Sequence, residues 1–170
     1  MRPEQHSGMV DVRHNSDELP VAYDIATVAD AMSRGVISVP PETPLRTVAR
    51  MMATFRVHAI FVFEHTDEDD EAPRLWAVVS DLDLVAAAQL DLDRQTAGGT
   101  AVTPLVTVSA SRPMAEAAGL MAQHGIAHLA VTEPETRRPI GVISTLDIAR
   151  AVAAGHDPGE TLPSAQTTPA

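Results

Sequence analysis

Two short stretches, Val78–Asp83 (VVSDLD) and Gly141–Asp147 (GVISTLD), decide the fold of this 170-residue chain. In both, apolar residues typical of a strand lead into a serine, and an aspartate follows three positions later. A serine is a favoured N-cap, and an acidic side chain in the first turn interacts well with the positive end of a helix. Each stretch therefore predicts a strand that runs directly into a helix.

The two stretches belong to an internal repeat. A shift of 69 residues lays Ser38–Val62 over Thr107–Val131, and a shift of 64 residues lays Ala77–Ala88 over Gly141–Val152. The difference falls in a longer loop of the first copy, Glu64–Leu75, which holds the acidic run DEDDE. Because length variation belongs in loops, the change of register supports the repeat.

Each copy has the pattern of strand, helix, strand, strand and helix. The first helix of each copy is expected to begin near Pro44 and Pro113, because proline suits the first turn, and Thr43 is a candidate N-cap. Apolar residues then recur at i, i+3, i+4 and i+7 in both copies. The other expected elements are strands at Val36–Val39, Ala59–Phe63, Trp76–Val79, Leu105–Val108, His128–Thr132 and Ile140–Ile143, and helices at Asp81–Leu90 and Leu146–Ala154.

These patterns predict an α/β (α+β) fold of two pseudo-symmetric βαββα repeats that pack face to face through their sheets. A unit of about 60 residues buries too little surface to be stable alone. The expected division of the chain is a disordered arm at 1–20, repeat 1 with a lead-in helix at 21–90, a linker at 91–103, repeat 2 at 104–155 and a disordered tail at 156–170. The lead-in helix is expected at 22–33, and Gly98–Gly99 is interpreted as a hinge in the linker.

Composition argues against several classes of function. Twelve arginines and no lysine stand against 23 acidic residues, and the net charge of −11 disfavours binding to nucleic acids or anionic membranes. The missing lysine excludes Schiff-base chemistry, and the missing cysteine excludes thiolate nucleophiles, disulfides and cysteine-ligated metals. No apolar run is long enough to span a membrane. We expect a cytoplasmic protein that binds neither nucleic acids nor membranes.

Candidate catalytic and metal sites are few. No Gly-x-Ser-x-Gly elbow surrounds a serine. His124 and His128 have the spacing of a helical metal pair, but Gly125 between them is expected to end the helix. The acidic run Asp67–Glu71 lacks the glycine and the fixed spacing of a calcium loop. We therefore expect no catalytic residues, no metal site and no required cofactor.

Taken together, the residues resemble the tandem cystathionine-β-synthase (CBS) domain pair of the stand-alone type. The resemblance covers about residues 26–154 and rests on Val28–Ser33, Pro41–Met52, Gly125–Val131 and, above all, the two opening stretches. Those two match the family's signature of two apolar residues followed by [Ser/Thr]-x-x-Asp. Two such signatures at the same place in a duplicated unit are a specific signal of this fold.

The resemblance implies a function in regulation. The chain is expected to be a non-catalytic regulatory or sensor module that binds AMP, ADP, ATP or S-adenosylmethionine in the clefts between its repeats and modulates a partner protein. The implied partners are a second copy, in a homodimer formed through helical faces, and a separate effector protein. The alternative is a ligand-free structural or oligomerisation module.

The resemblance and the nearby cations together give nine candidate ligand-binding positions. A serine hydroxyl and free N–H groups at a helix start suit an anion or a polar ligand edge, and an ionised aspartate accepts two hydrogen bonds from a ribose diol. The same serines and aspartates also suit a purely structural role as helix caps. The candidates are Ser38, Arg56, His58, Ser80, Asp83, Thr107, His128, Ser144 and Asp147.

The first copy departs from the family pattern in ways that bear on its cleft. Asp81 lies within the first signature, where many nucleotide-binding members carry a basic residue, and would repel a phosphate. Phe61 and Ala77 are larger than the family's usual residues and are expected to crowd the same cleft, whereas the second copy keeps Gly141. Arg56 is therefore the cation on which nucleotide binding is expected to depend.

Overall fold

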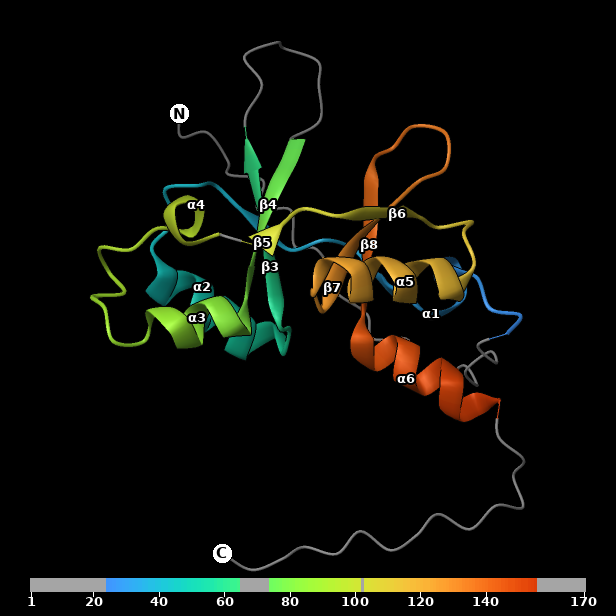
Figure 1. Cartoon of the computed structure of the whole chain (residues 1–170). Helices are drawn as coiled ribbons and strands as arrows, with labels where there is room; N and C mark the ends of the chain where they lie inside the picture. The colour runs from blue at the N-terminus through green and yellow to red at the C-terminus, as the bar shows by residue number, and fades with distance from the viewer. Residues whose placement is uncertain (1–23, 65–73, 102, 156–170) are drawn as a thin grey trace, which may run out of the picture.

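The structure is a computed structural model that describes residues 24–64, 74–101 and 103–155 (Figure 1). The arm expected at 1–20, the acidic run at 67–71 and the tail expected at 156–170 lie outside the described residues. Within the described ranges, no helix has the length and apolar character that crossing a bilayer requires.

Two four-stranded sheets have the same topology. In each sheet one pair of strands is parallel and the other pairs are antiparallel. Three strands of each sheet come from one repeat, and the fourth comes from the segment that precedes the other repeat. The first sheet has the order β2 (Ser38–Val39), β3 (Ala59–Glu64), β4 (Arg74–Ser80), β5 (Thr103–Pro104), and the second has the order β1 (Ser33–Arg34), β8 (Pro139–Ser144), β7 (His128–Thr132), β6 (Thr107–Ser109).

Six helices cover these sheets in the described part of the chain, and Figure 1 shows α2 and α3 beside the first sheet and α5 and α6 beside the second. The predicted apolar stripes are buried, with Leu45, Val48 and Met52 on α2 and their counterparts on α5. The alternation of strands and helices in the two copies confirms the predicted α/β fold. The helices are α1 (Val28–Ala31), α2 (Leu45–Phe55), α3 (Asp81–Ala87), α4 (Ala97–Thr100), α5 (Met114–His124) and α6 (Thr145–Ala154).

The start of α2 differs from the expectation, because Pro44 and not Thr43 is the N-cap. Proline has no side-chain acceptor, and the first N–H group of α2, on Leu45, donates instead to the carbonyl oxygen of Gln95 at 2.9 Å. The first N–H group of α5 donates in the same way to the carbonyl oxygen of Ala26 at 3.1 Å. Each long helix is thus capped by backbone from the segment that precedes the other repeat.

The two lead-in segments pack against opposite repeats, which the sequence analysis did not predict. The lead-in helix expected at 22–33 is the short helix α1, and Val28 is fully buried in the core of repeat 2. The stretch interpreted as a linker forms α4, and Ala97 is fully buried in the core of repeat 1. Gly98 is not a hinge, because its N–H group donates to the Pro41 carbonyl at 2.8 Å and an added Cβ would lie 2.8 Å from the Pro41 Cβ.

A separate cluster of apolar side chains joins the two repeats. Phe61 and Val78, which are cross-strand partners in the first sheet, are buried there with Ala59 and with Ala130 of the second sheet. This contact confirms that the repeats pack through their sheets. Ala77 points the other way, into the core of repeat 1, so it does not share the boundary with Phe61 as the sequence analysis expected. The reason is the alternation of side chains along β4.

Candidate ligand-binding site

The two signature stretches form matching helix caps. The Oδ2 atom of Asp83 accepts hydrogen bonds from the N–H group and the Oγ atom of Ser80 at 2.7 and 2.8 Å. The Oδ2 atom of Asp147 accepts the same two bonds from Ser144 at 2.8 and 2.7 Å. Each serine Oγ in turn accepts from the aspartate N–H group, which completes a capping box. Both aspartates are buried, so the strand-to-helix turn predicted from the sequence carries two carboxylates in fixed positions.

The second carboxylate has a cation beside it that the sequence analysis missed. The Nη1 atom of Arg150 donates to the Oδ1 atom of Asp147 at 3.2 Å. Arg150 lies three residues after Asp147 on α6, and that spacing on a helix is the signal that would have indicated the contact. The same shift of 64 residues that relates the signatures puts Ala86 at the corresponding position of repeat 1. The two helix starts therefore differ in charge.

A group of titratable side chains lies where the two repeats meet. The Nδ1 atom of His58 pairs with the Oδ2 atom of Asp81 at 2.9 Å. His128 begins β7, opposite Ser144 in the sheet register. Burial lowers the pKa of His128, the nearby Asp81 opposes that change, His58 adds to it and Asp147 opposes it. Charges from both copies thus act on one imidazole ring.

Ser38 and Thr107, the candidates on the outer strands, occupy equivalent places. Ser38 pairs with Phe61 across β2 and β3, and Thr107 pairs with Ala130 across β6 and β7. Their partners both belong to the apolar cluster between the sheets. The two residues therefore lie next to the boundary between the repeats, on opposite sheets.

Arg56, the candidate cation, has an unusual backbone. It ends α2 in the left-handed conformation with a φ of 55°, and its counterpart in repeat 2 is Gly125 with a φ of 63°. Its side chain is exposed and forms no ion pair with any residue in the described ranges. The structure thus gives Asp81 a histidine as its partner, not this arginine.

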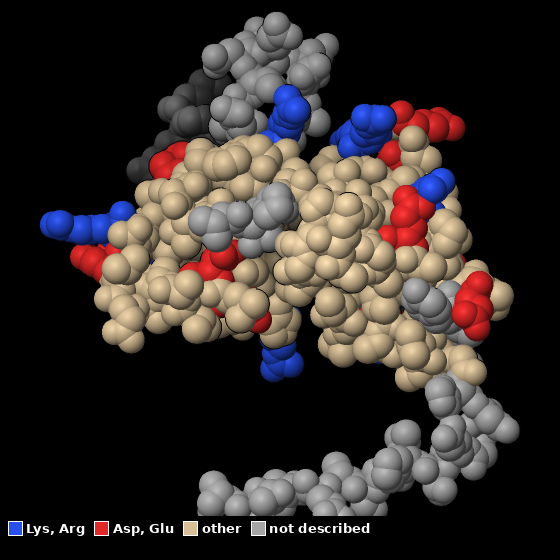
Figure 2. Space-filling model, in the orientation of Figure 1, with Lys and Arg blue, Asp and Glu red and all other residues tan. Residues whose placement is uncertain are grey.

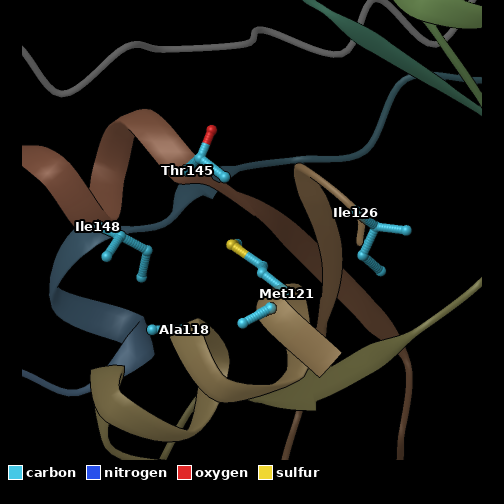
Figure 3. A pocket seen from close by; sticks show the side chains of 6 residues that line it. Ala118, Met121, Ile126, Thr145 and Ile148 are labelled. Atoms are coloured by element: carbon cyan, nitrogen blue, oxygen red, sulfur yellow. The ribbon is translucent and has the colours of Figure 1, made fainter. Parts of the chain in front are cut away.

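An apolar hollow of about 270 Å³ lies between α5 and α6 on the outer side of repeat 2 (Figure 3). None of the nine candidate residues lines it, although Thr145 at its rim follows Ser144 directly. In the part of the chain that the structure describes, no group of three or more histidine, aspartate or glutamate side chains is placed to hold a metal ion. The hollow is lined by Ala118, Met121, Ala122, Ile126, Thr145 and Ile148.

The lowered pKa of His128 predicts that stability depends on pH. The unfolded chain takes up this proton near the ordinary pKa of 6.5, before the folded protein does. The free energy of unfolding should therefore fall as the pH drops below about 6.5 and level off once the pH is below the folded pKa. Urea denaturation over this range should show a weaker pH dependence for His128→Gln than for the wild type. His124→Gln, at an exposed position of α5, is the control, and equal slopes for wild type and His128→Gln would contradict the prediction.

Comparison with known proteins agrees with this architecture. The family model of the CBS domain matches the chain twice, at residues 28–89 and 100–154. The crystal structure of Hypoxic Response Protein I, which has two coordinated zinc ions, is 29% identical over 74% of this chain and 98% of its own, with a TM-score of 0.56. A CBS domain protein from Pyrobaculum aerophilum, complexed with AMP, is 28% identical over 76% of this chain and 100% of its own, with a TM-score of 0.60.

A more distant structure shares the fold. The CBS domain pair of protein MJ0100, in complex with 5′-methylthioadenosine and S-adenosyl-L-methionine, is 18% identical over 77% of this chain and 98% of its own, with a TM-score of 0.65. The search of curated proteins finds no match. CBS domains are generally regulatory, non-catalytic modules, and no catalytic family is indicated. With the family model matched over both repeats, this chain belongs to the CBS domain family.

Proposed function

We propose that this protein is a non-catalytic regulatory module that binds an adenosine-containing ligand in the clefts between its repeats. The observation that carries the proposal is the pair of buried aspartates, Asp83 and Asp147, held in matching caps at the starts of α3 and α6. The cap uses the Oδ2 atom of each carboxylate, and a ribose diol would be recognised through the Oδ1 atom. AMP in a relative of 28% identity supports this class of ligand.

The conformation of Arg56 supports its role as a cation for the ligand. A left-handed backbone costs an ordinary residue about 1–2 kcal/mol, and glycine avoids this cost at the equivalent position of repeat 2. Strain of this kind is concentrated at functional sites. An exposed arginine in a place that favours glycine is therefore a good candidate for a residue that contacts a ligand phosphate.

Regulation requires that the ligand bind one state of the protein better than another. The boundary between the repeats suits this role, because Asp81 of repeat 1 and Asp147 of repeat 2 both act on His128 there. A ligand bound beside these groups would change the charges at the contact between the two sheets. Its occupancy would then be passed to a separate effector protein.

The second proposed partner is another copy of this chain. Exposed apolar side chains occur on α3, at Leu82 and Val85, and on α6, at Leu146 and Val152. The two leucines are equivalent under the repeat, so both copies offer an apolar helical face, and the hollow of Figure 3 lies beside the second one. A homodimer through these helices would cover both faces, and sedimentation velocity of the full chain measures whether it forms.

Ligand binding should raise the melting temperature. At a ligand concentration of about one hundred times Kd, binding adds about 2.7 kcal/mol to the free energy of unfolding, which is a shift of several degrees for a domain of this size. AMP is the first probe, in a thermal-shift series with ATP and S-adenosylmethionine. Asp147→Ala should weaken AMP binding more than Asp83→Ala does, by roughly 1.5–3 kcal/mol if charge-assisted bonds to the ribose are lost.

The ligand-free alternative is favoured by two observations. Both serine–aspartate pairs are already used as helix caps, and Phe61 occupies the boundary between the repeats. On this alternative, the module only holds its repeats, or a second copy, in place. The absence of a thermal shift with every adenosine compound at millimolar concentration would overturn the proposed function and leave this alternative.

A further inference from the structure

The two helix starts share one backbone arrangement and differ in two side chains that touch. The N–H group of Asp81 donates to the carbonyl oxygen of His58 at 3.0 Å, and that of Thr145 donates to the carbonyl oxygen of Ala127 at 3.0 Å. Repeat 1 thus has a histidine and an aspartate in contact where repeat 2 has an alanine and a threonine. The chain contains its own comparison between a charged and an uncharged version of one site.

In repeat 1, the carboxylate of Asp81 occupies the place of an anion at the start of α3. Its Oδ1 atom accepts from the N–H group of Leu82 at 2.9 Å, and its Oδ2 atom pairs with the ring of His58 at 2.9 Å. The N–H groups on either side are also used, since that of Asp81 donates to His58 and that of Asp83 donates to Ser80. The first three amides of this helix therefore all have acceptors within the chain.

In repeat 2, the corresponding helix start carries no such carboxylate. Thr145 takes the position of Asp81, and within the described ranges the N–H group of Leu146 has no acceptor. The cap formed by Ser144 and Asp147 is otherwise the same as in repeat 1. Repeat 1 therefore differs by one negative charge and by an amide that is already occupied.

The charge of Asp81 acts on any ligand held at Asp83, two residues away on the same turn. Like charges about 6 Å apart at a protein surface repel strongly enough to lower affinity about tenfold. His58 is the partner of Asp81, and no described arginine forms an ion pair with it. His128 lies across the boundary, and burial lowers its pKa, which favours the neutral ring at neutral pH.

We propose that Asp81 makes the Asp83 cleft selective for adenosine compounds without a phosphate, such as a thioether or sulfonium derivative of adenosine. The inference rests on the proposed function and narrows its ligand for one of the two clefts. A neutral or positively charged substituent on the ribose is compatible with the carboxylate at the start of α3. A phosphate would meet that carboxylate and would find no free amide among the first three residues of the helix.

The test isolates the first cleft in an Asp147→Ala background. Isothermal titration would measure Kd for AMP and for 5′-methylthioadenosine with Asp81 present and with Asp81→Asn. Asparagine keeps an oxygen that can accept from the Leu82 N–H group and removes the charge. We expect 5′-methylthioadenosine to bind about tenfold more tightly than AMP when Asp81 is present, and this preference to fall about tenfold in Asp81→Asn.

The reciprocal variant provides the matched control. In an Asp83→Ala background, Thr145→Asp places the same charge at the second cleft, and AMP affinity should fall about tenfold relative to 5′-methylthioadenosine. Equal preferences with and without the charge, in both backgrounds, would overturn the inference and leave the proposed function intact. If neither compound binds either cleft, the proposed function itself fails, and the inference falls with it.

Discussion

Replacing Phe61 with alanine is expected to lower the free energy of unfolding by about 3–5 kcal/mol, the range for removing a buried aromatic side chain. Phe61 is only 1% exposed and is the largest fully buried side chain of the described residues. It packs between the sheets with Val78 and Ala130, so its loss leaves a cavity where the repeats meet. Two elements from separate repeats would have to move together to fill that cavity.

Urea denaturation followed by circular dichroism measures this effect. Phe55→Ala is the matched control, because Phe55 is the same residue type at the end of α2 and is 46% exposed. Its truncation should cost less than half as much as that of Phe61. Similar losses for the two variants would show that Phe61 does not hold the repeats together, contrary to the packing described here.

Gly141→Ala is expected to detach the lead-in strand β1 from the second sheet. A Cβ at this position would lie 2.5 Å from the Ser33 carbonyl oxygen and 3.0 Å from the Sδ atom of Met32. The methionine can turn aside, but the carbonyl belongs to the backbone of β1, which pairs with β8 through Ser33 and Arg34. Overpacking of this kind costs about 1–3 kcal/mol, and here it acts on the contact that ties the segment before repeat 1 to repeat 2.

Gly119→Ala is the control for that variant. Gly119 lies within α5, and nothing lies within 4 Å of where its Cβ would be. Alanine is better than glycine inside a helix by up to about 1 kcal/mol, so this variant should gain stability while Gly141→Ala loses it. Thermal denaturation of both variants checks the opposite signs. A stable Gly141→Ala protein whose Ser33 amide is as protected from hydrogen exchange as in the wild type would refute the prediction.

The elements with a strong local pattern were predictable. The apolar stripes of α2 and α5 recur at helical spacing, and the structure buries their members Leu45, Val48 and Met114. The serine and aspartate of each signature are three residues apart, a separation that is local enough for the sequence alone to indicate a cap. The repeat itself followed from comparing the chain with itself, because the same pattern occurs twice.

Contacts between distant segments were not predictable from these patterns. Strands β1 and β5 are two residues long, too short to show any alternation, and they pair with the sheet of the opposite repeat. The backbone of Gln95 and Ala26 caps the long helices, and a carbonyl group leaves no mark in a sequence. For this reason the lead-in helix was assigned to the wrong repeat.

The sequence alone therefore determined that this chain is a duplicated unit with a capped helix after each signature strand, since hydrophobic period and capping act over a few residues. Only the tertiary structure decided which segment completes which sheet and which charge meets which partner. Asp81 was recognisable as a negative charge near the candidate site, but its pairing with His58 joins residues 23 positions apart. Such a pairing depends on how the strands align, which is set by the packing of the whole chain.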